Sequence, residues 1–327
     1  MTSTPNPAIS PLALIADDMR AVDRVIAQRL TTSVPLIGQI SHYIIAAGGK
    51  RLRPALLLLV CGALGYEGAQ RFNLAAVVEL IHTATLLHDD VVDESTMRRG
   101  RATANESFGN PASVLVGDFL HTRSFQMMVE AGSMRIMEIL SEATNVIAEG
   151  EVQQLINMHD ASLDEAGYLR VIRSKTAKLF EASAQLGAIL AGSPPAIEAA
   201  CATYGQALGT AFQIIDDVLD YDGDTAEMGK NIGDDLREGK STLPLIAAMQ
   251  RGTPEQAATV RHAIEQGSTE SLEKIVAIVK ETGALEIART AAHAEAQRAI
   301  AALDCIPNNT YSASLLQLAA QLLVRRT

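Results

Sequence analysis

Two long stretches without proline constrain the fold of this chain more than any other feature of the sequence. Proline is absent from residues 112–193 and from residues 255–306, so each stretch can hold several helices separated by glycine or polar turns. Elsewhere, as from Leu74 through Ile81 to Thr85, apolar or uncharged side chains recur at helical spacing. No segment reads convincingly as a strand. The sequence therefore predicts an all-α fold.

The expected helices occupy most of the chain. In the first third they cover residues 12–30, 36–47, 54–64 and 72–96. Four more are expected between residues 112 and 221, and shorter ones after them. Residues 222–241 hold glycines among many charges, which is typical of a loop. Because neither a fixed repeat nor a low-complexity linker is present, we predict a single domain over residues 1–327.

The charge balance and the cysteines exclude several classes of function. With Lys+Arg 27 against Asp+Glu 38, the net charge of −11 would repel a nucleic-acid backbone. The longest apolar run, between Arg53 and Glu67, is too short to cross a bilayer, and the amino terminus lacks the pattern of a secretory signal. The cysteines are few, odd in number and far apart, which favours reduced thiols. We expect a cytoplasmic protein without a transmembrane segment.

The segment from His88 to Glu94, HDDVVDE, places three carboxylates at the end of an apolar helix. Asp89 and Asp93 are four residues apart and share one helix face, with Asp90 beside them. Such carboxylates would repel one another at the edge of a core unless cations neutralise them. Ligands that are all oxygen suit Mg²⁺, although one motif alone could equally be a solvated acidic helix end.

A second copy of this spacing makes the metal interpretation stronger. Asp216, Asp217 and Asp220 again follow an apolar helical stretch, which ends at Ile215. Two acidic motifs on facing helices could hold one polyanion from both sides through several metal ions.

Two basic segments complete the pattern. In residues 48–54, GGKRLRP, two glycines and three cations precede Pro54, which suits the first position of a helix and predicts an anion site. In residues 97–101, MRRGR, arginines follow the first acidic motif directly. They could bind phosphate oxygens, or they could simply satisfy the last carbonyls of the helix. The first segment could likewise be a basic surface loop.

Together these residues closely resemble the trans-isoprenyl diphosphate synthases, and among them the members that make long chains such as octaprenyl. The resemblance extends over most of the chain, from about Gly48 to Leu245, and the paired aspartate motifs are highly specific. The matching segments are GGKRLRP (48–54), HTATLLHDDVVDESTMRRG (82–100), ASVLVGDF (112–119), SKTAKLFE (174–181), GTAFQIIDDVLDY (209–221) and GKNIGDDLREGKSTLPL (229–245).

The resemblance implies a fold, substrates and site residues. It implies the isoprenoid synthase fold, a large helical bundle around a central cavity, and a homodimer. It implies two or three Mg²⁺ ions held by Asp89, Asp90, Asp93, Asp216, Asp217 and Asp220. The diphosphate of isopentenyl diphosphate would be bound by Lys50, Arg53, His82 and Arg99. The allylic diphosphate would be bound by Arg98, Lys175, Lys230 and Lys240, with Thr176 and Gln213 near the reacting carbons.

The implied reaction ionises an allylic diphosphate, such as farnesyl diphosphate, and joins isopentenyl diphosphate to the resulting cation. Ala84 and Thr85, shortly before the first acidic motif, are small, so the growing chain can pass them. This favours a long polyprenyl product, the tail of a respiratory quinone. A plain core role is the simpler interpretation for each candidate for the floor of the tunnel. Those candidates are Phe125, Met127, Met128 and Met134.

Other functions explain fewer of these residues. A helical phosphohydrolase could use His82, His88 and Asp89, but it would leave the second acidic motif and the basic segments unexplained. A terpene cyclase would normally lack that second motif. A regulatory synthase subunit would be expected to lose acidic ligands, and a calcium loop beginning at Asp220 lacks the required glycine and glutamate. His88 reads best as a hydrogen-bonded core histidine.

Overall fold

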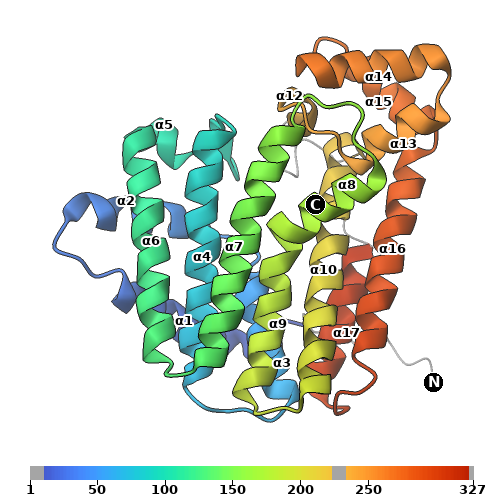
Figure 1. The fold of residues 1–327 in the computed structure, drawn as a ribbon. Helices are drawn as coiled ribbons and strands as arrows, with labels where there is room; N and C mark the ends of the chain where they lie inside the picture. Colours follow the sequence, from blue (N-terminus) through green and yellow to red (C-terminus); the bar gives the residue numbers. More distant parts are fainter. Residues whose placement is uncertain (1–10, 223–232, 324–327) are drawn as a thin grey trace, which may run out of the picture.

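The computed structural model describes residues 11–222 and 233–323, which consist almost entirely of helices (Figure 1). Residues 223–232, including Lys230, lie outside the described residues. The elements of the first half are η1 (Ala13–Ile15), α1 (Ala16–Arg29), α2 (Pro35–Ala46), α3 (Leu52–Ala63), α4 (Gln70–Val92), β1 (Met97–Arg98), β2 (Arg101–Ala102), α5 (Ala104–Phe108), α6 (Asn110–Glu130) and α7 (Met134–Asn157). The second half contains α8 (Glu165–Ile172), η2 (Arg173–Ala177), α9 (Lys178–Leu190), α10 (Pro195–Asp222), α12 (Asp234–Arg237), α13 (Leu243–Arg251), α14 (Pro254–Gln266), α15 (Leu272–Glu281), α16 (Ala284–Ala302) and α17 (Thr310–Leu323).

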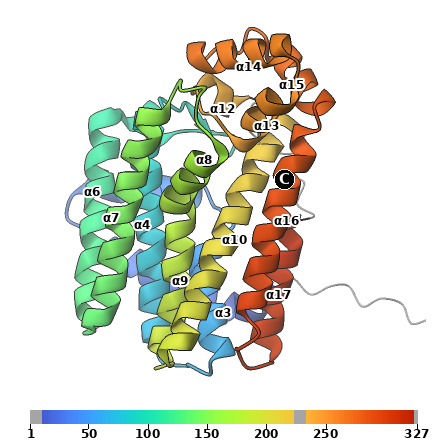
Figure 2. The same ribbon diagram turned by 45° about the vertical axis from the view of Figure 1, so that its right-hand side comes forward.

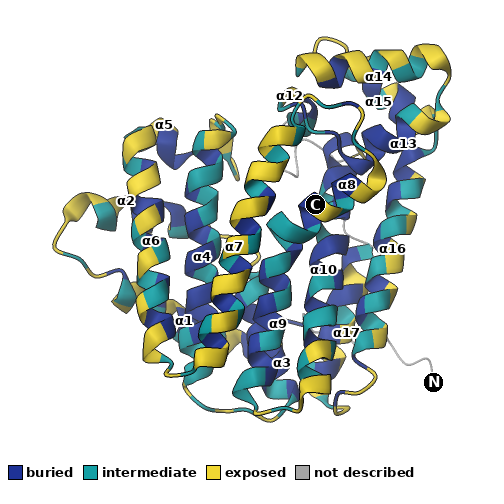
Figure 3. Ribbon diagram, in the orientation of Figure 1, coloured by how far each residue is buried: buried dark blue, intermediate teal, exposed yellow. Residues whose placement is uncertain are grey.

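The long helices run roughly along one direction and form a bundle, while α14 and α15 lie across one of its ends (Figures 1 and 2). Helix α4 packs against α6, α3 and α9, and α10 packs against α9 and α16. Helix α3 is buried along most of its length, because a continuous run of leucine and alanine gives it no polar face. The buried faces of the surrounding helices meet in the interior of the bundle (Figure 3).

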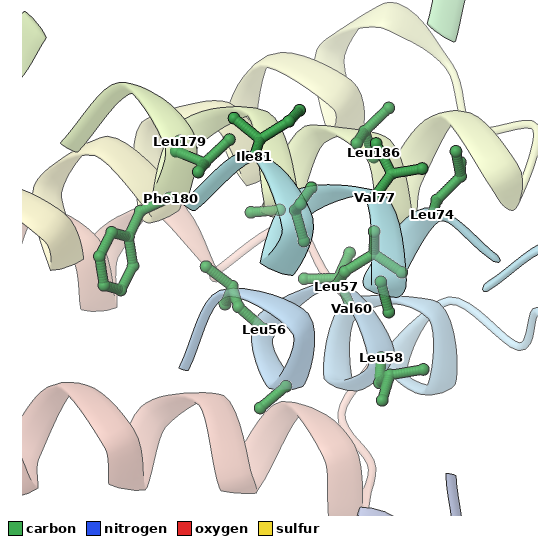
Figure 4. Close-up of a cluster of buried hydrophobic side chains, with 14 of the residues drawn as sticks. Leu56, Leu57, Leu58, Val60, Leu74, Val77, Ile81, Leu179, Phe180 and Leu186 are labelled. Carbon is green, nitrogen blue, oxygen red and sulfur yellow. The ribbon is translucent and has the colours of Figure 1, made fainter. Parts of the chain in front are cut away.

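Two clusters of buried apolar side chains stabilise this arrangement. The larger cluster joins α3, α4 and α9, where Leu57, Val77 and Leu186 lie close together (Figure 4). The smaller one surrounds the carboxyl half of α10, where Ile214 and Val218 pack with residues of α13 to α16. Both clusters include residues of α10, so this helix connects them. The single domain over residues 1–327 stays a prediction.

The sequence predicted most helices to within a few residues, and three local features differ. The helix that carries the first acidic motif ends at Val92, and a short antiparallel hairpin follows it, where no strand was expected. Helix α3 begins at Leu52, so Pro54 is its third residue and not its first. The segment predicted to be a loop before residue 241 contains α12 among its described residues.

Glycines allow three helices to approach one another closely around η2, a single π-helical turn that continues directly from α8 into α9. A methyl group on Gly150 of α7 would lie 2.8 Å from Ser174 Cβ and 2.9 Å from the backbone nitrogen of Lys175. On the other side, a methyl group on Gly209 of α10 would lie 2.7 Å from Ala177 Cα. Turns of π-helix are rare and are often found at functional sites. This one places Lys175 and Thr176 between α7 and α10.

Candidate active site

The first acidic motif lies where α4 ends and the chain turns into the hairpin. Arg99 and Gly100 form the tip of the hairpin, both with positive φ (52° and 73°), which are the conformations that a type I′ turn requires. The turn brings Arg98 back over the helix end, where its Nε and Nη2 donate to Oδ1 of Asp90 at 2.9 and 2.6 Å. Asp90 is buried, so this charged pair is shielded from solvent.

Two lysines from distant parts of the chain meet the other carboxylates of this motif. Lys175 Nζ lies 3.9 Å from Oδ2 of Asp89 and 2.5 Å from Oε2 of Glu151. Lys240 Nζ lies 3.2 Å from Oδ2 of Asp93. Burial raises the pKa of Asp89, and the charge of Asp93 adds to this rise, while Lys175 opposes it. Opposite charges are therefore concentrated at one end of the bundle.

Burial also changes the pKa values of Glu151 and Lys240, which lie beside the first motif. It raises the pKa of Glu151 to about 7 against the charge of Lys175. It lowers the pKa of Lys240, but Glu238 and Asp93 outweigh it, so that the pKa of Lys240 ends above its usual value. Lys240 therefore remains a cation near neutral pH.

The second acidic motif has a different environment. Asp217 is buried, and its Oδ2 accepts a hydrogen bond from the hydroxyl of Tyr168 at 2.6 Å. Its Oδ1 accepts from Nε2 of Gln213 at 2.8 Å, and Oε1 of Gln213 accepts from the hydroxyl of Thr176 at 2.9 Å. Burial raises the pKa of Asp217 well above its usual range, with Asp235 adding to it, while the two hydrogen bonds oppose the shift.

The other two carboxylates of this motif lie on either side of Asp217. Asp216 is half-buried, whereas Asp220 is buried and accepts a hydrogen bond from the backbone N–H of Asp235 at 3.3 Å. The sequence predicted all three aspartates as metal ligands, yet both oxygens of Asp217 accept hydrogen bonds from protein side chains.

A cavity of about 120 Å³ brings the two motifs into one region. Its wall includes Lys175 and Lys240, which pair with Asp89 and Asp93 of the first motif. The same wall includes side chains that hold or belong to the second motif, and these are Tyr168, Thr176, Gln213 and Asp217. Asp217 of the second motif and the two lysines paired with the first motif therefore line the same cavity. That both triplets converge on it stays a prediction.

Basic side chains gather around His82, two helical turns before Asp89. Burial lowers the pKa of His82 well below its usual range, and the charges of Arg53, Arg99 and Arg98 lower it further. Burial likewise lowers the pKa of Arg53 to about 10, while Glu79 opposes the shift. The Nε of Arg53 is buried without a hydrogen-bond partner in the described chain. A neutral histidine among several guanidinium groups is well suited to bind an anion.

The loop that precedes α3 joins this basic cluster. A methyl group on Gly49 would lie 2.7 Å from Nη1 of Arg99, so the loop backbone lies directly against that guanidinium group. Lys50 is exposed on the same loop. The two basic segments of the sequence thus meet at one place, beside the carboxyl half of α4.

The donors of this site fit a hard divalent cation. Oδ2 of Asp90 is buried without a hydrogen-bond partner in the described chain. Within residues 11–222 and 233–323, no three carboxylate, imidazole or thiol groups converge on one point. This is compatible with Mg²⁺, which is usually bound by one or two carboxylates and completed by water and substrate phosphates.

The structure also identifies side chains that the sequence did not single out. Glu151 lies against Lys175, Tyr168 holds Asp217, and Glu79 faces the basic cluster. Their partners come from other helices, so no local spacing could have indicated them. His88 fits the expectation of a hydrogen-bonded histidine, because its Nε2 lies 3.2 Å from the carbonyl oxygen of Val114, although it is only half-buried.

A helical bundle that carries two aspartate motifs close to one cavity, with a basic cluster beside the carboxyl half of α4, defines a prenyltransferase of the isoprenyl diphosphate synthase class. The sequence profile of the polyprenyl synthetase family matches residues 34–281, and the chain belongs to this family. Octaprenyl diphosphate synthase from Escherichia coli is 55% identical over 307 residues, which cover 94% of this chain and 95% of that protein.

Two further relatives agree with this membership. All-trans-nonaprenyl-diphosphate synthase (geranyl-diphosphate specific) from Rhodobacter capsulatus is 46% identical over 310 residues, 94% of each chain. A solved structure of a polyprenyl synthase from Caulobacter crescentus, complexed with calcium and isoprenyl diphosphate, has a TM-score of 0.94 at 45% identity and covers 97% of both chains. In the described part of this chain, no helix combines the length and the apolar character that crossing a bilayer requires.

Proposed function

We propose that this enzyme elongates an allylic diphosphate such as farnesyl diphosphate with isopentenyl diphosphate until it reaches a long polyprenyl diphosphate, with octaprenyl diphosphate as the expected product. The observation that carries the proposal is the cavity lined by Asp217 of the second motif and by the two lysines that pair with Asp89 and Asp93 of the first. The length of the product follows the similarity to the octaprenyl synthase of Escherichia coli. Such a product would serve as the side chain of a quinone.

The carboxylates are proposed to hold two or three Mg²⁺ ions on the allylic diphosphate. Asp89, Asp93 and Asp216 are the main candidates, with Asp90 and Asp220 beside them. Bound Mg²⁺ would neutralise the charge that develops on the departing diphosphate. Arg98, Lys175 and Lys240, and by resemblance Lys230, would contact the same diphosphate directly. A diphosphate between Lys175 and Lys240 would lie next to Asp89 and Asp93, because each lysine is within 4 Å of one of these carboxylates.

The basic cluster is proposed to bind isopentenyl diphosphate. Arg53, His82 and Arg99 would surround its diphosphate, and Lys50 would close the site from the loop. The charges of the three arginines disfavour a proton on His82, so that the neutral imidazole can donate one hydrogen bond without adding a charge. Thr176 and Gln213 would face the reacting carbons, where their oxygen atoms can stabilise the allylic cation.

The growing chain is proposed to extend along α4 away from the aspartates. Ala84 is buried and Thr85 is half-buried, and neither is large enough to block such a path. Met127 and Met128 are buried and Phe125 is half-buried, so they remain candidates for the floor of the tunnel. Met134 is 82% exposed in this chain and is therefore not a candidate for a buried floor.

An aromatic side chain at position 85 tests this path. In Thr85→Phe, we expect the longest product to be shorter than that of the wild type, because the ring would occupy the space that the chain needs. Thin-layer chromatography of the dephosphorylated products measures the lengths. Thr290→Phe, on the exposed surface of α16, is the matched control and should leave product length unchanged. An unaltered product in Thr85→Phe would contradict the path.

A homodimer is also proposed, with the faces of α6 and α7 as the contact between two copies. Large apolar side chains are exposed on both helices, and Leu115 of α6 and Ile156 of α7 are 66% and 67% exposed. A protein of this size rarely leaves such a set in contact with water. Light scattering on the purified chain would give the mass of a dimer, and Leu115→Glu combined with Ile156→Glu would give that of a monomer.

The activity itself is tested with purified protein, farnesyl diphosphate, isopentenyl diphosphate and Mg²⁺. We expect intermediates that converge on one long polyprenyl diphosphate, and no elongation when a chelator removes the metal. Release of inorganic phosphate without any new carbon–carbon bond would favour a phosphohydrolase and contradict the proposal.

A further inference from the structure

The hydrogen bonds around Asp217 form one continuous chain across three helical elements. Tyr168 of α8 and Gln213 of α10 each donate to a different oxygen of Asp217, and Thr176 of η2 donates to Gln213. Tyr168 and Asp217 are both buried, so no water is needed to complete these bonds. The hydroxyl of Tyr168 is therefore three hydrogen bonds away from the hydroxyl of Thr176.

The hydrogen bonds give every group in this chain a definite orientation. The amide NH₂ of Gln213 faces Asp217, and its carbonyl oxygen faces Thr176. The hydroxyl proton of Thr176 is then used in the bond to Gln213, and the lone pairs of Thr176 remain for the cavity. If Asp217 could rotate, Gln213 could turn its amide over and direct N–H groups at the position where positive charge develops.

We propose that Tyr168 is a positioning residue for the condensation, because it holds Asp217 in the orientation that aligns Gln213 and Thr176. This inference rests on the proposed function, since it assigns Gln213 and Thr176 to the stabilisation of an allylic cation. In this role Tyr168 reaches the reacting carbons only through Asp217, Gln213 and Thr176. Its hydroxyl acts through Asp217 on the direction of two dipoles.

The same bonds give Asp217 a role different from that of its neighbours in the second motif. Both of its oxygens already accept hydrogen bonds, at 2.6 and 2.8 Å, so a metal ion at either oxygen would have to share it with a protein donor. We therefore assign Asp217 to orientation and leave metal binding in the second motif to Asp216 and Asp220. This departs from the sequence prediction, which placed Asp217 among the metal ligands.

Tyr168→Phe tests the role of the hydroxyl, with Tyr204→Phe as its matched control. Tyr204 is also buried, and its hydroxyl donates a single hydrogen bond, at 2.7 Å, to the carbonyl of Leu315, outside the cavity. Both variants should lower the melting temperature by similar amounts. Only Tyr168→Phe should lower kcat, by roughly 10- to 100-fold for a lost bond to a buried carboxylate, with KM for isopentenyl diphosphate unchanged.

Asp217→Asn tests the orientation directly, because an Asn amide can donate to Gln213 and allow its amide to turn over. It should lower kcat at least as far as Tyr168→Phe, while the Mg²⁺ concentration for half-maximal rate stays within about twofold of the wild type. The double variant Tyr168→Phe/Asp217→Asn should be no slower than Asp217→Asn alone, because both changes break one chain of bonds.

Two results would overturn the assignment. One is a kcat for Tyr168→Phe equal to that of Tyr204→Phe, which would make Tyr168 a purely structural residue. The other is an Asp217→Asn variant that regains the wild-type kcat at high Mg²⁺, which would make Asp217 a metal ligand. If the wild type forms no elongated product at all, the proposed function fails instead, so the two failures are distinguishable.

Discussion

The two aspartate motifs of this chain have the same spacing and yet occupy different environments. In the first motif the helix ends at Val92, so that Asp93 lies beyond its last residue and the chain turns back through the hairpin. In the second motif α10 continues to Asp222, so all three aspartates remain on the helix. The point at which each helix ends therefore determines which side chains contact the carboxylates of its motif.

This difference shows in the partners of each motif. The first is surrounded by cations, since Arg98 holds Asp90 while Lys175 and Lys240 approach Asp89 and Asp93. In the second, Asp217 and Asp220 accept hydrogen bonds from neutral donors, which are a phenol, an amide and a backbone N–H. The strength of an ion pair changes when a charged substrate or a metal ion binds nearby. The strength of a neutral hydrogen bond depends mainly on the distance and angle between its two groups. We infer that the first motif handles the charge of the substrate and that part of the second serves geometry.

The largest expected effect compares one aspartate from each motif. Asp89→Asn should lower kcat by roughly 10³-fold or more, because it removes a proposed metal ligand that must neutralise the departing diphosphate. Asp217→Asn should lower kcat less, by roughly 10- to 100-fold, because it removes only alignment. Single-turnover rates at saturating Mg²⁺ measure both. Equal losses at the two positions would remove the functional distinction between the motifs.

A second comparison concerns stability. Arg98→Met leaves the buried Asp90 without its cation, which should lower the free energy of unfolding by about 3 kcal/mol. Arg20→Met removes a surface ion pair whose side chains are 65% and 86% exposed, so it should remain close to the wild type. Urea unfolding followed by circular dichroism measures both. A loss in Arg98→Met no greater than in Arg20→Met would mean that the charge of Asp90 is balanced in another way.

Local pattern was enough to predict the helices and the shared face of Asp89 and Asp93, because helical spacing depends only on residues a few positions apart. It also indicated that the basic segments belong with the acidic ones. It did not indicate the hairpin, whose turn depends on positive φ at Arg99 and Gly100. The arginines were expected at a helix end, and the turn instead directs Arg98 onto Asp90.

The role of Asp217 was not predictable for a different reason. Its two donors include Tyr168, which is 49 residues away in sequence, and the connection depends on the π-helical turn that follows α8. The extra residue in this π-helical turn changes which side chains face α10. No periodic pattern in the sequence indicates where such a turn occurs. The sequence thus indicates that carboxylates gather at this end of the bundle, and only the tertiary contacts distinguish their environments.

The smallest effect that we predict concerns Glu151, which lies beside the first motif. Its folded pKa of about 7 exceeds the value of 4.5 expected in an unfolded chain, so the folded state holds a proton that unfolding releases between these pH values. This contribution to stability is complete below pH 4.5 and is lost as the pH rises to about 7. Glu151→Gln cannot titrate there. Relative to this variant, the wild type should therefore lose on the order of 2 kcal/mol from pH 4.5 to 7.5.

Urea unfolding at several pH values, with a chelator present, would measure this difference. Glu138→Gln is the matched control, because Glu138 lies on the same helix, is 66% exposed and forms a surface ion pair with Arg135. That variant should follow the pH dependence of the wild type. Parallel curves for the wild type and Glu151→Gln would mean that Lys175, 2.5 Å from Glu151, keeps its carboxylate ionised throughout. Glu151, the residue of α7 beside the first motif, would then stay unprotonated. The first motif would differ from the second only in the cations that surround its carboxylates.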